Sequence, residues 1–262
     1  MSDQIIGLHE WLESPTGRYL LAWERAQLDL AVADIFGFHA LQLGLPELEA
    51  LAANRMPHRW LASQTLTPGA AFVTDFSALP FPANSLDLVV LPHSLELARD
   101  PHTTLREVER VLVPEGRVVI CGLNPTSLWG LRQRHARTRQ RAGAQNLFLP
   151  ESGEFIGYWR LRDWLRLLGF EVEVGHFGCY RPAFSSDKWS HRFEWMERAG
   201  ARWWPILGGA YFLVAVKRVR GMTLLSPAWK ASRALANAPV SVANSSTLTQ
   251  ANALNDKKVT RE

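Results

Sequence analysis

The chain has 262 residues, of which 47% are hydrophobic, and a formal net charge of +4. This composition is typical of a globular protein with one main domain and a core of ordinary size. The longest apolar run, residues 207–216, is shorter than the roughly 20 residues of a spanning helix, and the N-terminus lacks a signal-peptide layout, so we expect a soluble cytoplasmic chain with no membrane partner.

The cysteines limit the class of protein, and the charges indicate possible partners. Cys121 and Cys179 have no CxxC or Cys/His spacing, which excludes a disulfide framework and predicts no metal site. Basic residues gather in two stretches without acids, residues 124–150 and 198–255, so the rest of the chain is net acidic. Such stretches can meet a nucleic acid or an anionic lipid, or they can be ordinary solvated surface.

In chain order, the first predicted element is a helix over residues 17–36, with apolar side chains at helical spacing and Gly37 as its stop. Strand-like apolar runs then follow at residues 39–44, 58–63, 70–75, 86–93, 116–123, 171–177 and 211–218. Helices are predicted over residues 102–112 and 160–170. The central runs are continuous rather than alternating, which indicates strands buried on both faces.

These elements predict an α/β fold, a three-layer sandwich with helices on both faces of a mostly parallel sheet. We expect an N-terminal helical segment over residues 1–37, the main domain over 38–220, and a disordered tail over 221–262, where few large apolar side chains remain. Ligands of such sheets bind beyond the carboxyl ends of the strands. The residues that follow each strand are therefore the candidates for a site.

Residues 72–120 carry a family resemblance. The run "DFSALPFPANSLD", the step "RVLVPEGRVVI", and later "LRDWLRLLGFEVEV" before a final "YFLVAVKR" resemble the type 11, ubiquinone-methylase-like group of class I S-adenosylmethionine-dependent methyltransferases. The resemblance covers roughly residues 38–218. It implies a seven-stranded sheet of order 3-2-1-4-5-7-6 with an antiparallel last strand, S-adenosylmethionine as cofactor, and a methyl acceptor that the sequence does not name.

Carried over residue by residue, the resemblance places the cofactor at the ends of four strands. Asp75 stands where the family's acid meets the adenine amine, and the backbone N–H of Phe76 meets the ring. Leu91 belongs to the segment that lines the methionine arm. From spacing alone, Asp75 is equally suited to capping the turn that follows it.

The loop after the first strand departs from the family's pattern. Gly44 matches the first of three alternate glycines, but Pro46 and Leu48 stand where the other two belong, and Gln42 replaces an acid. Glycine serves such loops because it adopts φ angles that other residues resist and leaves the backbone bare for the ligand. The acid expected at the end of the second strand is also missing, and only Ser63 or Gln64 stands in its place.

Other segments leave alternatives open. His93, just beyond the fourth strand, is the candidate general base, and the alternative is a histidine that only caps the strand end; His176 is a weaker candidate. The arginine-rich segment 132–141 suits a phosphate or RNA contact, a lid, or a solvated helix. In segment 188–204, Trp189, Phe193, Met196 and Trp203 are expected to pack on the sheet rather than stack on bases.

Three functions follow as hypotheses. The first is methyl transfer from S-adenosylmethionine to an acceptor, preferably a small molecule. The second is a scaffold or interaction module that keeps the fold without catalysis. The third is an RNA-binding modifier that uses the two basic stretches.

Overall fold

The computed structural model describes residues 8, 11–140, 155–182, 193 and 195–219, and of residues 136–140 the backbone alone. Over these residues seven strands form one sheet of order β3-β2-β1-β4-β5-β7-β6, which is the predicted order. The strands are β1 (His39–Leu43), β2 (His58–Ser63), β3 (Phe72–Val73), β4 (Leu86–Pro92), β5 (Leu112–Leu123), β6 (Phe170–Gly178) and β7 (Ala210–Lys217).

The first five strands run parallel to one another, and β7 is antiparallel to both β5 and β6. The antiparallel last strand was predicted. The strands at the centre of the sheet are buried on both faces: all eight residues of β7 and the last five of β4 are buried. Continuous apolar runs in these strands therefore reflect helices on both sides.

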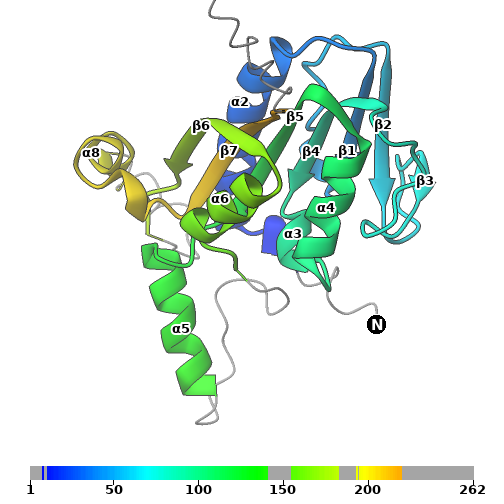
Figure 1. Cartoon of the computed structure of the whole chain (residues 1–262). Helices are drawn as coiled ribbons and strands as arrows, with labels where there is room; N and C mark the ends of the chain where they lie inside the picture. Colours follow the sequence, from blue (N-terminus) through cyan, green and yellow to red (C-terminus); the bar gives the residue numbers. More distant parts are fainter. Residues whose placement is uncertain (1–7, 9–10, 141–154, 183–192, 194, 220–262) are drawn as a thin grey trace, which may run out of the picture. The chain divides into compact units, whose positions relative to one another are not determined.

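Figure 1 shows how the helices cover the sheet. Helix α2 (Pro15–Ala33) lies behind it, and α4 (Pro101–Val111) and α6 (Tyr158–Leu167) lie in front, which confirms the three-layer prediction. The other helical segments are α3 (Ser94–Leu97), α5 (Leu128–Gln140), α8 (Trp195–Trp203) and the 3-10 turns η1 (Pro46–Leu48) and η2 (Pro205–Leu207).

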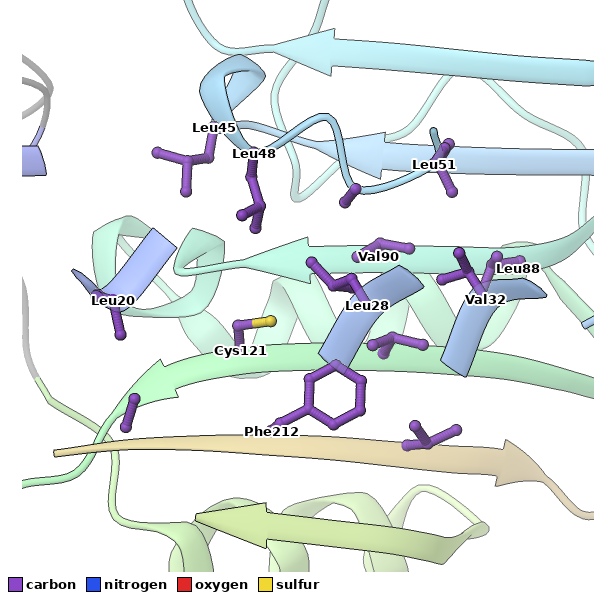
Figure 2. Packing of buried hydrophobic residues seen from close by; sticks show 14 of the residues in the cluster. Leu20, Leu28, Val32, Leu45, Leu48, Leu51, Leu88, Val90, Cys121 and Phe212 are labelled. Atoms are coloured by element: carbon purple, nitrogen blue, oxygen red, sulfur yellow. The ribbon is translucent and has the colours of Figure 1, made fainter. Parts of the chain in front are cut away.

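Helix α2 begins at Pro15, where the Ser14 hydroxyl accepts a hydrogen bond from the Gly17 N–H at 3.1 Å. Its apolar stripe, Leu20, Leu28 and Val32, is fully buried against the sheet, next to side chains such as Val90 and Phe212 (Figure 2). The helix ends at Ala33, earlier than the predicted Phe36.

The opposite face is closed in the same way by α4 and α6. Asp100 caps α4 by accepting from the N–H groups of His102 and Thr103, and Leu105 and Val108 are fully buried. In α6, Leu161 and Leu165 complete the cluster on this face. Each face of the sheet thus has its own core.

The two halves of the sheet differ in their cover. The connection between β1 and β2 contains only η1 as helix, and β3 has two residues where six were predicted.

The prediction that Trp203 packs on the sheet is wrong, because Trp203 at the end of α8 is exposed (74%). Trp189 lies outside the described residues.

The chain divides into two compact units, residues 1–219 and 220–262. All described residues belong to the first unit. The predicted disorder of residues 221–262 lies outside the described residues and stays a prediction. The same holds for Arg141 at the end of the arginine-rich segment.

Candidate cofactor and acceptor site

The carboxyl ends of β1, β2 and β4 meet at one edge of the sheet because these strands are parallel neighbours. The residues predicted to form the site either belong to the last residues of these strands or follow the ends of β1, β3 and β4. They are Gln42, Gly44, Ser63, Asp75, Phe76, Leu91 and His93. The structure brings them to one edge but gives them different environments.

Gly44, Phe76 and Ser94 lie together at this edge although they follow three different strands. A Cβ added at Gly44 would stand 3.5 Å from the Ser94 hydroxyl and 3.7 Å from the Phe76 ring, which is ordinary contact. Gly44 has a φ of +75°, a conformation that favours glycine, and it remains partly accessible. The bare backbone expected of a cofactor loop is therefore present at this position.

Ser94 ties the end of β4 to the end of β1. Its buried hydroxyl donates to the carbonyl oxygen of Leu43, and it also lies 3.2 Å from the carbonyl oxygen of Pro92. The hydroxyl thus bridges two neighbouring strands where their ladder ends. Sequence reasoning missed Ser94 because a single serine after a strand carries no distinctive signal.

Gln42 is buried and holds the loop that follows it. Its Nε2 donates to the carbonyl oxygens of Gly44 (3.0 Å) and Leu45 (2.8 Å), and its Oε1 accepts from the Ala50 N–H (2.8 Å). A carboxylate in this position could not donate to the two carbonyls. The glutamine that replaces the family's acid is therefore matched to this loop, whose Gly44 and Leu45 carbonyl oxygens point toward its side-chain amide.

The leucines of this loop explain its course. Leu45 and Leu48 are buried in the same cluster as Leu20 of α2 (Figure 2), whereas Phe76 belongs to the cluster on the opposite face. Leu48 therefore does not occupy the space around Phe76. Burial of the two leucines stabilises a tight turn in which Leu45 and Glu49 both adopt the left-handed conformation.

Asp75 and Ser63 are both engaged locally. Asp75 is exposed, and its Oδ1 accepts from the Ser77 N–H at 2.9 Å, so it caps the turn as the alternative interpretation predicted. Hydrogen bonds from Ser77, the backbone one foremost, hold the pKa of Asp75 below its usual range, so the carboxylate is charged at neutral pH. The buried Ser63 hydroxyl pairs with the Thr67 hydroxyl at 3.1 Å.

Leu91 is fully buried in the cluster on the α4 face. Its side chain therefore packs in the core between the sheet and α4 and does not face the site. His176 is exposed on β6, where it pairs with Phe212 of β7.

His93 lies in a buried cluster of charged side chains. Its Nδ1 is 2.8 Å from Glu96 Oε2 on α3, and its Nε2 is 2.9 Å from Glu24 Oε1 on α2. Glu96 also accepts from the Leu123 N–H at the end of β5, at 2.5 Å. We call Glu24, His93 and Glu96 the buried triad; it joins α2, the end of β4 and the end of β5.

The electrostatics of the triad keep His93 charged. Burial by itself would lower the pKa of His93, but the facing carboxylates of Glu24 and Glu96 raise it well above the usual value. Burial also raises the pKa of Glu96. With both N–H groups donating to carboxylates, neither ring nitrogen can accept a proton from a substrate. Catalysis by His93 stays a prediction that this placement does not favour.

Glu24 was not anticipated from the sequence. It precedes His93 by 69 positions and lies in a helix that the apolar pattern had already explained. Within the described part of the chain, its Oε2 is buried without a hydrogen-bond partner. The one available signal was a glutamate close to the apolar stripe of an amphipathic helix, which is too common to single out.

A hollow of about 360 Å³ lies over the face of β1 and β2, where the short η1 turn leaves the strands partly uncovered. Its lining comes from β1, from β2 and from the connection between them, and it includes Gln42 of the candidate site. It is lined by Gln42, Pro46, Glu49, Leu51, Ala52, Arg59, Trp60 and Leu61. Among the described residues there is no group of histidines, cysteines and acids arranged for a metal ion, and no helix with the length and apolarity to cross a membrane.

Comparison with known proteins gives one family match. The model of the family described as "Methyltransferase domain" matches residues 46–120, the stretch that runs from η1 into the buried part of β5. This stretch includes Asp75, Phe76 and the buried triad's His93 and Glu96. It begins just after Gly44, where the loop departs from the glycine pattern.

Relatives cover more of the chain. The "Uncharacterized protein YafS" of Escherichia coli (strain K12) is 32% identical over 216 residues, which is 82% of each chain. A "Malonyl-[acyl-carrier protein] O-methyltransferase" of Halorhodospira halophila is 40% identical over 68 residues, 26% of this chain and 23% of that one. A solved structure, an S-adenosylmethionine-dependent methyltransferase from Archaeoglobus fulgidus, has the same fold with a TM-score of 0.52 at 18% identity and covers 75% of this chain and 94% of its own.

Proposed function

Because this chain belongs to the type 11 group of class I S-adenosylmethionine-dependent methyltransferases, we propose that it transfers a methyl group from S-adenosylmethionine to an acceptor held at the carboxyl edge of β1 and β4. The observation that carries this proposal is the meeting of Gly44, Phe76 and Ser94 at that edge, with accessible backbone at Gly44. The acceptor is preferably a small molecule, and we place the activity in the cytoplasm.

The residues at the edge fit the cofactor in part. Gly44 offers bare backbone, Asp75 offers a charged, exposed carboxylate for an amine, and the backbone of Phe76 is next to it. Gln42 and Ser63 already use their polar atoms within the chain, so we assign them to holding the loops. Leu91 supports the edge from within the core.

When bound, S-adenosylmethionine supplies a methyl group on an electrophilic sulfonium. What the protein must add is alignment of the acceptor and exclusion of water. Ser94 and the buried triad fix the segment after β4, which stands beside Gly44. We therefore propose that His93 positions this segment through its two carboxylate partners.

Titration calorimetry of the full chain with S-adenosylmethionine and with its demethylated product tests the cofactor assignment. Replacing the charged acceptor in Asp75→Asn should weaken binding by about tenfold. Asp100→Asn is the matched control, because Asp100 is also an exposed carboxylate that accepts backbone N–H groups, and it should bind like the parent.

Absence of binding heat for the parent chain with either ligand would contradict methyl transfer and favour the scaffold hypothesis. That hypothesis has its own support, because Gln42 and Ser63 are both committed to contacts within the chain. Equal affinity of the parent and Asp75→Asn would instead remove Asp75 from the site.

A further inference from the structure

A run of exposed apolar side chains lies between β6 and β7, outside the candidate site. All residues from Ala201 to Leu207 are exposed, and four of them are large apolar side chains, Trp203, Trp204, Ile206 and Leu207. Trp195, the first residue of α8, is also exposed (59%). A soluble domain rarely leaves so many large apolar groups in sequence without a partner.

Helix α5 extends this surface. Asn124, in the loop before α5, donates through Nδ2 to the carbonyl oxygens of Ile206 (2.7 Å) and Gly208 (2.9 Å), so this loop is tied to η2 and the residue after it. On α5, Leu128 and Leu131 are exposed. We call the exposed side chains of α5, α8 and η2 the α5–α8 surface.

The exposed charges of this surface are positive. The only acid of α8, Glu197, turns inward, where it accepts from the Tyr180 N–H at 3.1 Å and lies 3.9 Å from the Arg181 side chain. Arg198 and Arg202 of α8 are exposed. Arg132 and Arg134 of α5 are exposed too. The hydrogen bonds of Asn124 to Ile206 and Gly208 join the two acid-free stretches, which lie far apart in the sequence.

We propose that the α5–α8 surface docks on an anionic lipid bilayer. Tryptophan and arginine suit the headgroup region, where an apolar body and a polar or charged end are both satisfied. The aliphatic side chains Leu128, Ile206 and Leu207 favour hydrocarbon over nucleic-acid bases, which stack on aromatic rings. The charge of the arginines complements anionic lipids.

This surface lies at the same edge of the sheet as the candidate site, the edge formed by the carboxyl ends of the parallel strands. Helix α5 follows the carboxyl end of β5, and η2 precedes Ala210, which pairs with Leu123 at that end. Docking is peripheral and needs no spanning helix. It departs from the sequence-based expectation of no membrane partner, which rested on the lack of a long apolar run and of a signal-peptide layout, although the basic stretches also suit an anionic lipid. Docking does not depend on cofactor binding, so its test is separate from that of methyl transfer.

The test is co-sedimentation of the full chain with vesicles of phosphatidylcholine, with and without an equal part of phosphatidylglycerol. The parent should sediment with the anionic vesicles, and less so as salt rises. Trp203→Ser/Leu207→Ser should bind on the order of tenfold more weakly. Arg198→Gln/Arg202→Gln should lose about fivefold per arginine on the anionic vesicles.

Matched controls come from the end of α6. Leu167 and Arg166 are exposed there, and α6 ends near the start of β6, at the opposite edge of the sheet. Leu167→Ser and Arg166→Gln should sediment like the parent. Since all substituted side chains are exposed, loss of folding is not expected, and circular dichroism checks it.

Three outcomes would overturn the proposal. The first is a parent chain that stays in the supernatant with anionic vesicles at low salt. The second is sedimentation of Trp203→Ser/Leu207→Ser equal to that of the parent. The third is loss of RNA binding in Arg198→Gln/Arg202→Gln with unchanged vesicle binding, which would make this surface a nucleic-acid interface.

Discussion

The two loops at the carboxyl edge, Gly44–Ala50 after β1 and His93–Leu97 after β4, are each held by a buried polar side chain, but in opposite ways. Gln42 is neutral, and its donor and acceptor are matched to backbone groups. His93 is charged and depends on two carboxylates from other elements. The neutral arrangement is local and insensitive to pH, whereas the charged one links three elements and depends on every member.

The largest effect is expected from removing the cation of the buried triad. His93→Leu leaves Glu24 and Glu96 buried without their partner and should lower the free energy of unfolding by about 3–5 kcal/mol, measured by urea denaturation at neutral pH. His176→Leu, on an exposed position of β6, should change it little.

A variant without charges separates charge from packing. Glu24→Gln/His93→Leu/Glu96→Gln should recover part of the stability lost in His93→Leu, because no charge remains buried. If His93→Leu has the same urea midpoint of unfolding as the parent, the contrast drawn between the two loops is wrong.

The loop after β1 should respond less strongly. Gln42→Glu replaces two donated hydrogen bonds by a buried carboxylate facing two carbonyls, and it should cost roughly 2–3 kcal/mol in the same urea assay. Gln64→Glu is the matched control, since Gln64 is exposed just after β2. Equal stability of the two variants would show that the amide does not hold the loop.

A pair of glycine substitutions sharpens the role of this loop. Gly44→Ala and Gly69→Ala both place a side chain at positive φ, +75° and +85°, so each should cost about 1–2 kcal/mol. Gly69 has no atoms within 4 Å of the added Cβ. Affinity for S-adenosylmethionine, measured by calorimetry, should fall for Gly44→Ala alone; a similar fall in both variants would argue against cofactor contact at Gly44.

A further test of the charged arrangement is the dependence of stability on pH. The pKa of His93 is raised in the folded state, so its contribution is complete below its unfolded value of 6.5 and is lost as pH rises toward the folded pKa. Urea denaturation from pH 6.5 upward should therefore show a decline in stability. The measurements should stay below pH 9.0, which is the usual pKa of a cysteine thiol. Burial raises the pKa of Cys121, next to the triad, above that value, so above pH 9.0 the thiol would add its own pH dependence.

The charge-free triad variant should lack this decline. Within the described part of the chain, Glu24, Glu96, Cys121, Cys179 and Tyr211 are the titratable groups that act on one another around His93. The variant removes the two carboxylates as well as the imidazole. A decline of equal slope in the parent and in the variant would assign the pH dependence to other groups.

Much of the fold was predictable. The run at residues 58–63 became β2 with the same bounds, and the helix predicted over residues 102–112 is α4, one residue displaced. These segments are long enough, and their apolar period clear enough, for local pattern to decide. The strand predicted over residues 70–75 kept only two residues, because it lies at the sheet edge with β2 as its single neighbour.

The positions of the site residues were predictable from the sequence, but their side-chain contacts were not. Asp75 and Gly44 stand where the strand ends placed them, because a turn residue's place depends on its own neighbours in the chain. The exposure of Trp203 was not predictable, since helical spacing does not say which face of α8 meets the sheet; there Gly200 is the buried residue, packed against Tyr180.

The sequence by itself determined the strands, their order through the family resemblance, and the edge at which a ligand would bind. Only the tertiary structure decided that His93 meets Glu24 and that Gln42 turns its amide onto the loop. The physical reason is that these contacts depend on how α2 packs. Leu45 and Leu48 pack against its apolar face, and this packing places Glu24 at the end of β4, next to His93. Such partners are set by burial across the fold and leave no trace in local spacing.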